Sequence, residues 1–143
     1  MNENSRLQNH LSLIRSCAGW TAEAFGKRLG VSRQTISAFE REGNELTMMQ
    51  YLAIRKVLDD ELTKSSDNKE MLSLILEVLV DHPENYKSEE REEVLSKAKL
   101  MAPAIMKEPS ERKTVSMAWK AILIASGVIV TTALVSWLNG KDT

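Results

Sequence analysis

The sequence predicts an all-α protein with a small head of four to five helices, a short helical middle segment and a single C-terminal transmembrane helix. Three observations lead to this prediction. Helix caps and apolar residues spaced three or four positions apart recur over residues 6–62. Two shorter apolar periodic runs follow within residues 66–102. Residues 121–138 then form an apolar run without a single charged side chain.

The charge distribution follows the same division. The 143 residues carry a net charge of only −1, but residues 1–58 hold eight Lys and Arg against five Asp and Glu. Residues 59–117 hold nine against fourteen, so a mildly basic head precedes an acidic middle segment. The distribution of charge matters more than its total for attraction to phosphate. This pattern permits a head that binds nucleic acid.

The inventory of reactive side chains is small. Cys17 is the single cysteine, which excludes an intrachain disulfide and a cysteine metal cluster. His10 and His82 stand apart, without the spacing of metal ligands. We therefore expect no catalytic residue, no metal and no cofactor, and a binding protein in place of an enzyme.

The outer helices of the head are predicted from apolar spacing. The first helix has apolar residues at the i, i+4 and i+7 positions, namely Leu7, Leu11 and Ile14. Near the end of the head, Thr47 is suited to cap a further helix. The apolar residues of that helix recur every three or four positions, at Met48, Tyr51, Ile54 and Leu58.

The segment between these helices predicts two helices joined by a tight turn. Thr21 is suited to N-cap a helix that runs to Leu29. Gly30 follows, where a helix end favours a left-handed residue. Ser32 is a second N-cap, and the next helix begins at Arg33. A helix, a glycine turn and a second capped helix is the arrangement that places a recognition helix in the major groove of DNA.

The second helix of this pair offers polar side chains to a partner. Its apolar residues Ile36 and Phe39, with Val31 as a buried spacer, are expected to face inward. Arg binds guanine and Gln binds adenine through two hydrogen bonds, a small Ala contacts a thymine methyl, and helix N-termini suit phosphate. A plain helical hairpin with a solvated polar face is the alternative. The candidate DNA-binding residues are Thr21, Ser32, Arg33, Gln34, Thr35, Ser37 and Ala38.

The segment that contains these two helices resembles the lambda-repressor/Cro-type helix-turn-helix family, also called the XRE family. The resemblance covers Arg6–Leu62 and rests on GWT at 19–21, LGVSRQTIS at 29–37 and FE at 39–40. It implies a lambda-repressor-like DNA-binding domain at residues 6–62, with double-stranded DNA as the partner. Because one small head gives little affinity and paired half-sites double the contact, we also expect a homodimer.

The resemblance implies further roles for single residues. In the family, an Arg near the end of the first helix pairs with the Glu that closes the recognition helix, and Arg15 and Glu40 occupy these places. The family usually has Gln where this chain has Ala22, and Ala at the tight helix–helix contact where this chain has Gly26. We therefore expect Arg15 and Glu40 to form a structural ion pair.

The middle segment, residues 66–102, predicts two short helices. Asp67 and Glu70 resemble a capping pair before an apolar run that His82-Pro83 ends. A second helix is expected after Ser88 and ends at Pro103. Such helices bury their apolar faces only against something else, which is either the head or a second copy of the chain. The segment is thus a candidate dimerisation element.

Residues 103–117 predict a linker, because they combine prolines, a serine and mixed charges. The transmembrane helix is expected at 119–138, bracketed by Trp119 and Trp137 as aromatic belts are. As a helix, its 18-residue apolar run is about 27 Å long, close to the thickness of a bilayer core. More basic residues precede this run than follow it, which predicts a single-pass protein of the cell membrane with its N-terminal domain in the cytoplasm.

Taken together, the sequence predicts a bacterial transcription regulator tethered to the cytoplasmic face of the membrane, with DNA, the lipid bilayer and a second copy as partners. Two alternatives stay open. In the first, the helix-turn-helix fold binds a protein at the membrane, in a layout that resembles the cell-shape protein RodZ. In the second, the chain is a soluble regulator whose C-terminal helix oligomerises.

Overall fold

The structure is a computed structural model, which describes residues 2–41, 43–64, 69–107, 109–112, 114–115 and 118–119. These residues form helices and no strand. The α-helices are α1 (Glu3–Asn9), α2 (Leu11–Cys17), α3 (Ala22–Leu29), α4 (Arg33–Phe39), α5 (Met48–Thr63), α6 (Lys69–Leu76) and α7 (Ser88–Lys107). A π-helical turn η1 (Glu77–Asp81), a 3₁₀ turn η2 (Pro83–Asn85) and a 3₁₀ turn η3 (Pro109–Glu111) complete the regular structure.

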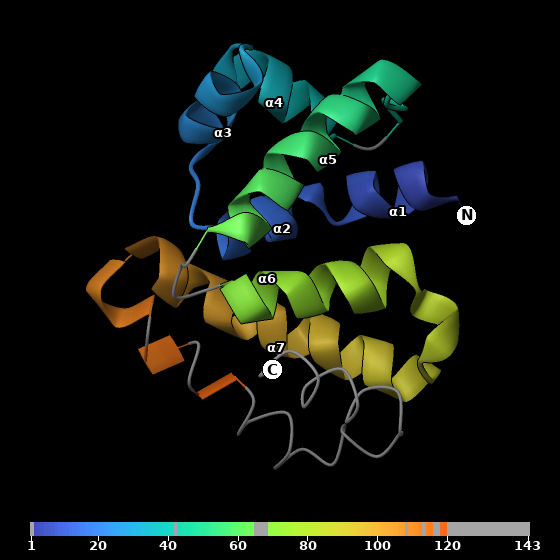
Figure 1. The fold of residues 1–143 in the computed structure, drawn as a ribbon, viewed down its shortest axis with the longest axis vertical. Helices are drawn as coiled ribbons and strands as arrows, with labels where there is room; N and C mark the ends of the chain where they lie inside the picture. Colours follow the sequence, from blue (N-terminus) through green and yellow to red (C-terminus); the bar gives the residue numbers. More distant parts are fainter. Residues whose placement is uncertain are drawn as a thin grey trace.

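The helices form two groups with α1 and α2 between them. Figure 1 shows α3, α4 and α5 on one side of this pair and α6 and α7 on the other. α2 packs against both α6 and α7, and α1 packs against η1. α1 and α2 therefore pack on the middle segment, and α5 also contacts it directly through α6.

One hydrophobic core spans the head and the middle segment. Leu11 of α2, Leu74 of α6 and Val94 of α7 are completely buried and belong to the same cluster. The apolar faces of α6 and α7 are therefore covered by the head of the same chain. Packing on the head was one of the two arrangements expected for this segment, and it is the one present within this single chain.

The first helix differs from the prediction, because the expected single helix is divided at His10. This residue has φ −113° and ψ 12°, and its amide binds the carbonyl of Leu7 at 3.2 Å. Leu7, Leu11 and Ile14 are nevertheless all completely buried, as the spacing predicted. The division lets α1 pack on η1 while α2 packs on α6 and α7, a tertiary requirement that local spacing does not reveal.

The longest helix of the head, α5, begins at the predicted cap. The Thr47 hydroxyl accepts the amide of Gln50, and the Gln50 side chain accepts the amide of Thr47, which makes a complete capping box. Tyr51 is 8 % exposed, and Ile54 and Leu58 are completely buried. Met48 is 64 % exposed, so its expected place in the core is wrong.

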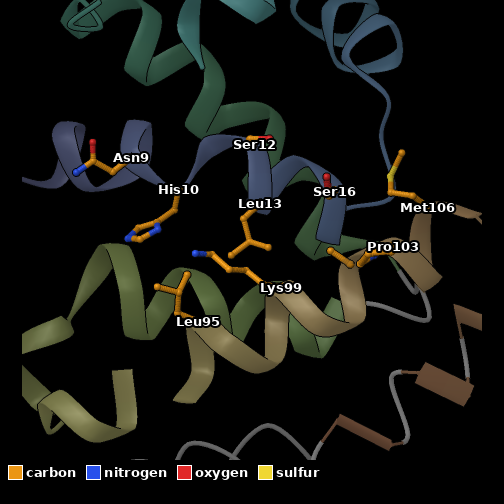
Figure 2. Close-up of a pocket in the computed structure, with 10 residues that line it drawn as sticks. Asn9, His10, Ser12, Leu13, Ser16, Leu95, Lys99, Pro103 and Met106 are labelled. Carbon is orange, nitrogen blue, oxygen red and sulfur yellow. The ribbon is translucent and has the colours of Figure 1, made fainter. Parts of the chain in front are cut away.

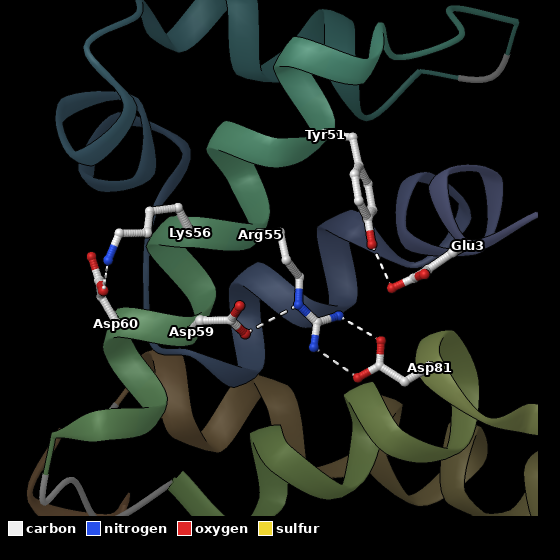
Figure 3. A network of polar contacts seen from close by, with 7 residues as sticks. All are labelled: Glu3, Tyr51, Arg55, Lys56, Asp59, Asp60 and Asp81. Atoms are coloured by element: carbon white, nitrogen blue, oxygen red, sulfur yellow. Dashed lines mark hydrogen bonds and ion pairs between the residues drawn. The ribbon is translucent and has the colours of Figure 1, made fainter.

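A polar network fastens α5 to the rest of the molecule (Figure 3). The Arg55 guanidinium binds both carboxylate oxygens of Asp81 in η1, at 2.6 and 2.7 Å, and Asp59 at 3.1 Å. Although burial acts to lower the pKa of Arg55, the bonds and charge of Asp81 outweigh it and raise that pKa. The Tyr51 hydroxyl donates to Glu3 of α1 at 2.5 Å. α5 is thus tied at separate points to α1 and to η1.

The helical run of the middle segment ends at His82-Pro83, as predicted. η1 stops at Asp81, and Pro83 begins the 3₁₀ turn η2. The capping residue proposed for this run, Asp67, lies outside the described residues.

The predicted end of the following helix at Pro103 is wrong, because α7 continues to Lys107. Proline removes one backbone donor, the amide that would bind the carbonyl of Lys99. Beyond the proline, Ile105 is completely buried in the core. Burial of this turn outweighs the lost hydrogen bond.

The prediction of a linker at residues 103–117 is wrong for the residues that the structure describes there, because they fold onto the head. The Arg112 guanidinium donates to the carbonyl of Ile105 at 3.0 Å and to that of Gly19 at 3.3 Å. It thereby caps the end of α7 and contacts the turn before α3. Composition did not reveal these contacts, since they join residues far apart in the sequence.

The expectation for Trp119 is also wrong. It is 1 % exposed and belongs to the core, so its side chain packs against the protein and is not free to face lipid. The apolar run 121–138 and Trp137 lie outside the described residues. Among the helices of the described part, none combines the length and the apolar character needed to cross a bilayer.

Candidate nucleic-acid interface

The α3–turn–α4 unit is built from the local signals that the sequence carries. The Thr21 hydroxyl accepts the amide of Ala24 at 3.0 Å at the start of α3. Gly30 ends α3 with φ 77°, in the left-handed region that favours glycine. The Ser32 hydroxyl then accepts the amide of Thr35 at 3.1 Å and starts α4. Both predicted caps and the glycine turn are confirmed.

Gly26 allows α3 and the turn to approach closely. A Cβ atom at this position would lie 2.6 Å from the carbonyl oxygen of Val31, a backbone atom that has little freedom to move. The Val31 amide also donates to the Gly26 carbonyl at 2.9 Å, which holds the turn against the helix. Glycine at this contact therefore fixes the position from which α4 starts.

The two faces of α4 differ sharply. Ile36 is completely buried, and Phe39 packs partly buried against the core. On the other face, Arg33, Gln34 and Ser37 are exposed. The inward side chains fix the rotation of α4, so that its polar residues are presented together to solvent.

The remaining candidate residues surround this exposed face to different extents. Ser32 is exposed and its hydroxyl lies 3.0 Å from that of Thr35, which is half-buried, as is Ala38. Thr21 is exposed but lies at the start of α3, where its hydroxyl is engaged in the cap. Val31, expected to be a buried spacer, is only half-buried. The residues of α4 thus form the centre of the candidate interface, and Thr21 is separate from it.

The ion pair implied by the resemblance is present in the structure. Arg15 Nε lies 2.6 Å from Glu40 Oε2, and Arg15 Nη2 lies 3.2 Å from Glu40 Oε1. Each side chain is 14 % exposed. Arg15 also donates to the carbonyl of Trp20 at 2.9 Å. Because Glu40 is the C-cap residue of α4, this pair ties the end of the recognition helix to α2.

An aromatic pair that the sequence analysis missed supports the start of α3. The rings of Trp20 and Phe25 stack with centroids 5.5 Å apart, and the guanidinium of Arg28 lies 4.6 Å above the Trp20 ring. These two aromatic residues flank the cap Thr21 at the positions of a hydrophobic staple. The spacing of that motif was available in the sequence and would have found the contact.

Gln8 is a second functional support that the sequence analysis missed. Its amide nitrogen donates to the carbonyl of Phe39 at 2.9 Å and to that of Asn44, and its oxygen accepts the amide of Leu46 at 3.1 Å. One side chain of α1 therefore holds the loop between α4 and α5. No local motif predicts such a long-range contact.

The described residues near the α3–turn–α4 unit offer little reactive or metal-binding chemistry. Cys17 is completely buried, and burial raises the pKa of its thiol to about 12, which fits a packing residue. The described residues contain no group of His, Cys, Asp or Glu that could hold a metal ion. The exposed groups around α4 are instead cationic or polar, with Arg28, Arg33 and Arg41 all accessible.

Comparison with known proteins agrees with this geometry. The helix-turn-helix family matches residues 18–62, which include α3, the turn, α4 and most of α5. A curated relative, Antitoxin HipB of Escherichia coli (strain K12), is 30 % identical over 59 residues, which cover 41 % of this chain and 67 % of HipB. No solved structure matches the chain. The family match stops before α6 and α7.

Proposed function

We propose that this chain, which belongs to the XRE-type helix-turn-helix family, is a sequence-specific DNA-binding regulator that reads its operator with α4. The observation that carries the proposal is the presentation of Arg33, Gln34 and Ser37 on the exposed face of a capped helix. Arg33 donates two hydrogen bonds to a guanine edge, and Gln34 pairs with an adenine edge. The α4 N-terminus and the Ser32 and Thr35 hydroxyls contact phosphate.

The support behind α4 makes this geometry useful for recognition. Base readout needs side chains whose helix is held firmly by its surroundings. Gly26 sets the start of α4 and the Arg15–Glu40 pair holds its end. The exposed residues of α4 are therefore presented from a helix fixed at both ends.

Genome-wide occupancy of the full-length protein tests this function. We expect discrete sites that share a short motif with two related half-sites. The best site is then transferred to purified protein and compared with scrambled DNA of equal length. Occupancy without a shared motif, or equal affinity for both DNAs, would contradict the proposal.

We propose a homodimer as the DNA-binding form. Three large apolar side chains at the start of α5 are exposed, by 64 % at Met48, 81 % at Met49 and 58 % at Leu52. A second copy of this patch would cover them, and two heads would contact two half-sites. We expect Met49→Glu to convert a dimer to a monomer in light scattering, whereas Leu100→Glu on α7 leaves the mass unchanged. A monomeric parent protein would contradict this form.

We further propose that residues 121–138 anchor the protein in the cell membrane with the head in the cytoplasm. This proposal rests on the uncharged apolar run and on the basic residues that precede it. The run begins just after Trp119, which is buried in the core, so the head would lie directly at the membrane surface. We expect the full-length protein in the membrane fraction, and release after deletion of residues 120–143. A full-length protein that stays in the supernatant would favour the soluble, oligomeric alternative.

The similarity to Antitoxin HipB favours a second candidate function, that of an antitoxin-type regulator. In that case the chain would also neutralise a toxin protein. The test is to express each neighbouring gene alone and together with this chain. Growth arrest that the chain relieves would support this function, and the absence of any such neighbour would count against it.

A further inference from the structure

A groove of about 510 Å³ lies between α2 and α7, away from the exposed face of α4 (Figure 2). His10, Leu13 and Ser16 line it from the N-terminal helices, and Leu95, Lys99 and Met106 line it from α7. Its volume lies within the range of small-molecule sites, which is roughly 300–1,000 Å³. The groove joins the helix-turn-helix head to the middle segment.

The groove has a cationic end and an apolar body. Figure 2 shows the Lys99 ammonium and the His10 ring pointing toward each other from the two walls. None of the ten described residues that line the groove is acidic. Leu13, Leu95 and Met106 supply apolar surface along its length. An anion with an apolar chain matches both features.

Lys99 is available for such a ligand. The residues three and four positions away on α7 are Leu95, Ser96, Ala102 and Pro103, so none can pair with it along the helix. In the part of the chain that the structure describes, no ion pair of Lys99 is found. Lys97, two residues earlier, is bound to Glu93 at 3.6 Å. Lys97 therefore already has a carboxylate partner, whereas the Lys99 ammonium can bind an anionic ligand.

The ionisation of His10 is affected by its burial in the groove and by the nearby Lys99. Burial first, and the charge of Lys99 second, lower the pKa of its imidazole. A negatively charged ligand between the two groups would favour the protonated imidazole and so act against this lowering. Ser12 and Ser16, one turn apart on α2, also belong to the lining of the groove.

We propose that this groove binds a small amphipathic anion, with its carboxylate or sulfonate at Lys99 and His10 and its apolar chain against Leu13, Leu95 and Met106. α2 also carries Arg15, whose partner Glu40 closes α4. A ligand that shifts α2 would therefore change the presentation of α4. The regulatory role of the groove rests on the proposed DNA-binding function, whereas the binding site itself does not.

Direct titration tests the site with the full-length protein in detergent. The probe is 8-anilinonaphthalene-1-sulfonate, whose fluorescence rises in apolar surroundings and is therefore measured against the same detergent without protein. Decanoate and decanol compete against it. We expect saturable binding that decanoate displaces and decanol, which has the same chain length without the charge, does not. Displacement by both competitors to the same degree would contradict a cationic site.

Two matched variants locate the binding. We expect Lys99→Gln to weaken decanoate binding roughly tenfold, because a hydrogen bond to a charged group is lost. Lys97→Gln, on the same helix but outside the groove, should bind as the parent protein does. Equal loss in both variants, or no loss in Lys99→Gln, would overturn the site.

The regulatory role has a separate readout. We expect saturating decanoate to change the affinity for the best genomic DNA site at least about threefold, and to leave Lys99→Gln unaffected. Decanoate binding without any change in DNA affinity would overturn the regulatory role. A protein that binds decanoate but no DNA would instead overturn the proposed function, so the two failures are distinguishable.

Discussion

Helices α4 and α6 are nearly equal in length but are stabilised in different ways. α6 buries five of its eight residues, whereas α4 buries one residue, Ile36, of seven. α4 depends instead on the Ser32 cap and on the Arg15–Glu40 pair at its end. The difference teaches that the recognition helix is held mainly at its ends, which leaves its surface free for a ligand. α6 uses its surface to complete the core.

The comparison predicts the largest loss of stability at α6. Leu74 is completely buried between the head and the middle segment, so Leu74→Ala should lower the free energy of unfolding by about 2–5 kcal/mol. Urea denaturation followed by circular dichroism measures it. The matched control is Leu100→Ala, at a residue that is 69 % exposed on α7, which should change stability by less than about 0.5 kcal/mol. Equal effects of the two variants would show that the α6 core does not hold the fold.

The second effect concerns the end of α4. Glu40→Gln removes the charge that pairs with Arg15, and we expect a loss of about 2–3 kcal/mol. This is below the value for a fully buried pair because each side chain keeps 14 % of its surface exposed. The same denaturation curves measure the loss. The control is Glu23→Gln. Glu23 lies 3.6 Å from Lys27 in an exposed ion pair, so this change should leave the free energy of unfolding nearly unchanged. A Glu40→Gln protein as stable as the parent would show that the pair does not hold α4.

A smaller effect is expected at the start of α4. Alanine is a better helix former than glycine by about 0.5–1 kcal/mol, but a Cβ at Gly26 would lie 2.6 Å from the Val31 carbonyl oxygen. We expect the clash to prevail. Gly26→Ala should then lower the free energy of unfolding by about 1–2 kcal/mol, which is measured as a lower melting temperature. An increase in the melting temperature would show that the turn relaxes without cost and that the contact does not fix α4.

The same two regions show what the sequence could predict. The caps Thr21, Ser32 and Thr47 and the left-handed Gly30 act within a few residues, and the structure has each of them in place. The exposed face of α4 followed from the same local spacing. The Trp20–Phe25 stack was missed although its motif is local.

Features fixed by distant contacts could not be predicted in this way. The division at His10 depends on the different partners of α1 and α2, and the continuation of α7 past Pro103 depends on the burial of Ile105. The Arg112 contact with Gly19 joins residues that are 93 positions apart in the sequence. Gln8 supports the α4–α5 loop for a similar reason. In each case burial or a long-range hydrogen bond overrides the local signal.

The most direct measurement of the central claim is the DNA affinity of Arg33→Ala at the best genomic site, together with its stability. Arg33 is exposed on α4, so the comparison with α6 predicts an unchanged urea denaturation curve. It also predicts a loss of about 1–3 kcal/mol in specific binding, with a smaller loss on scrambled DNA. Gln34→Ala should behave in the same way. An Arg33→Ala protein that binds the best site as tightly as the parent would contradict the assignment of α4 as the recognition helix.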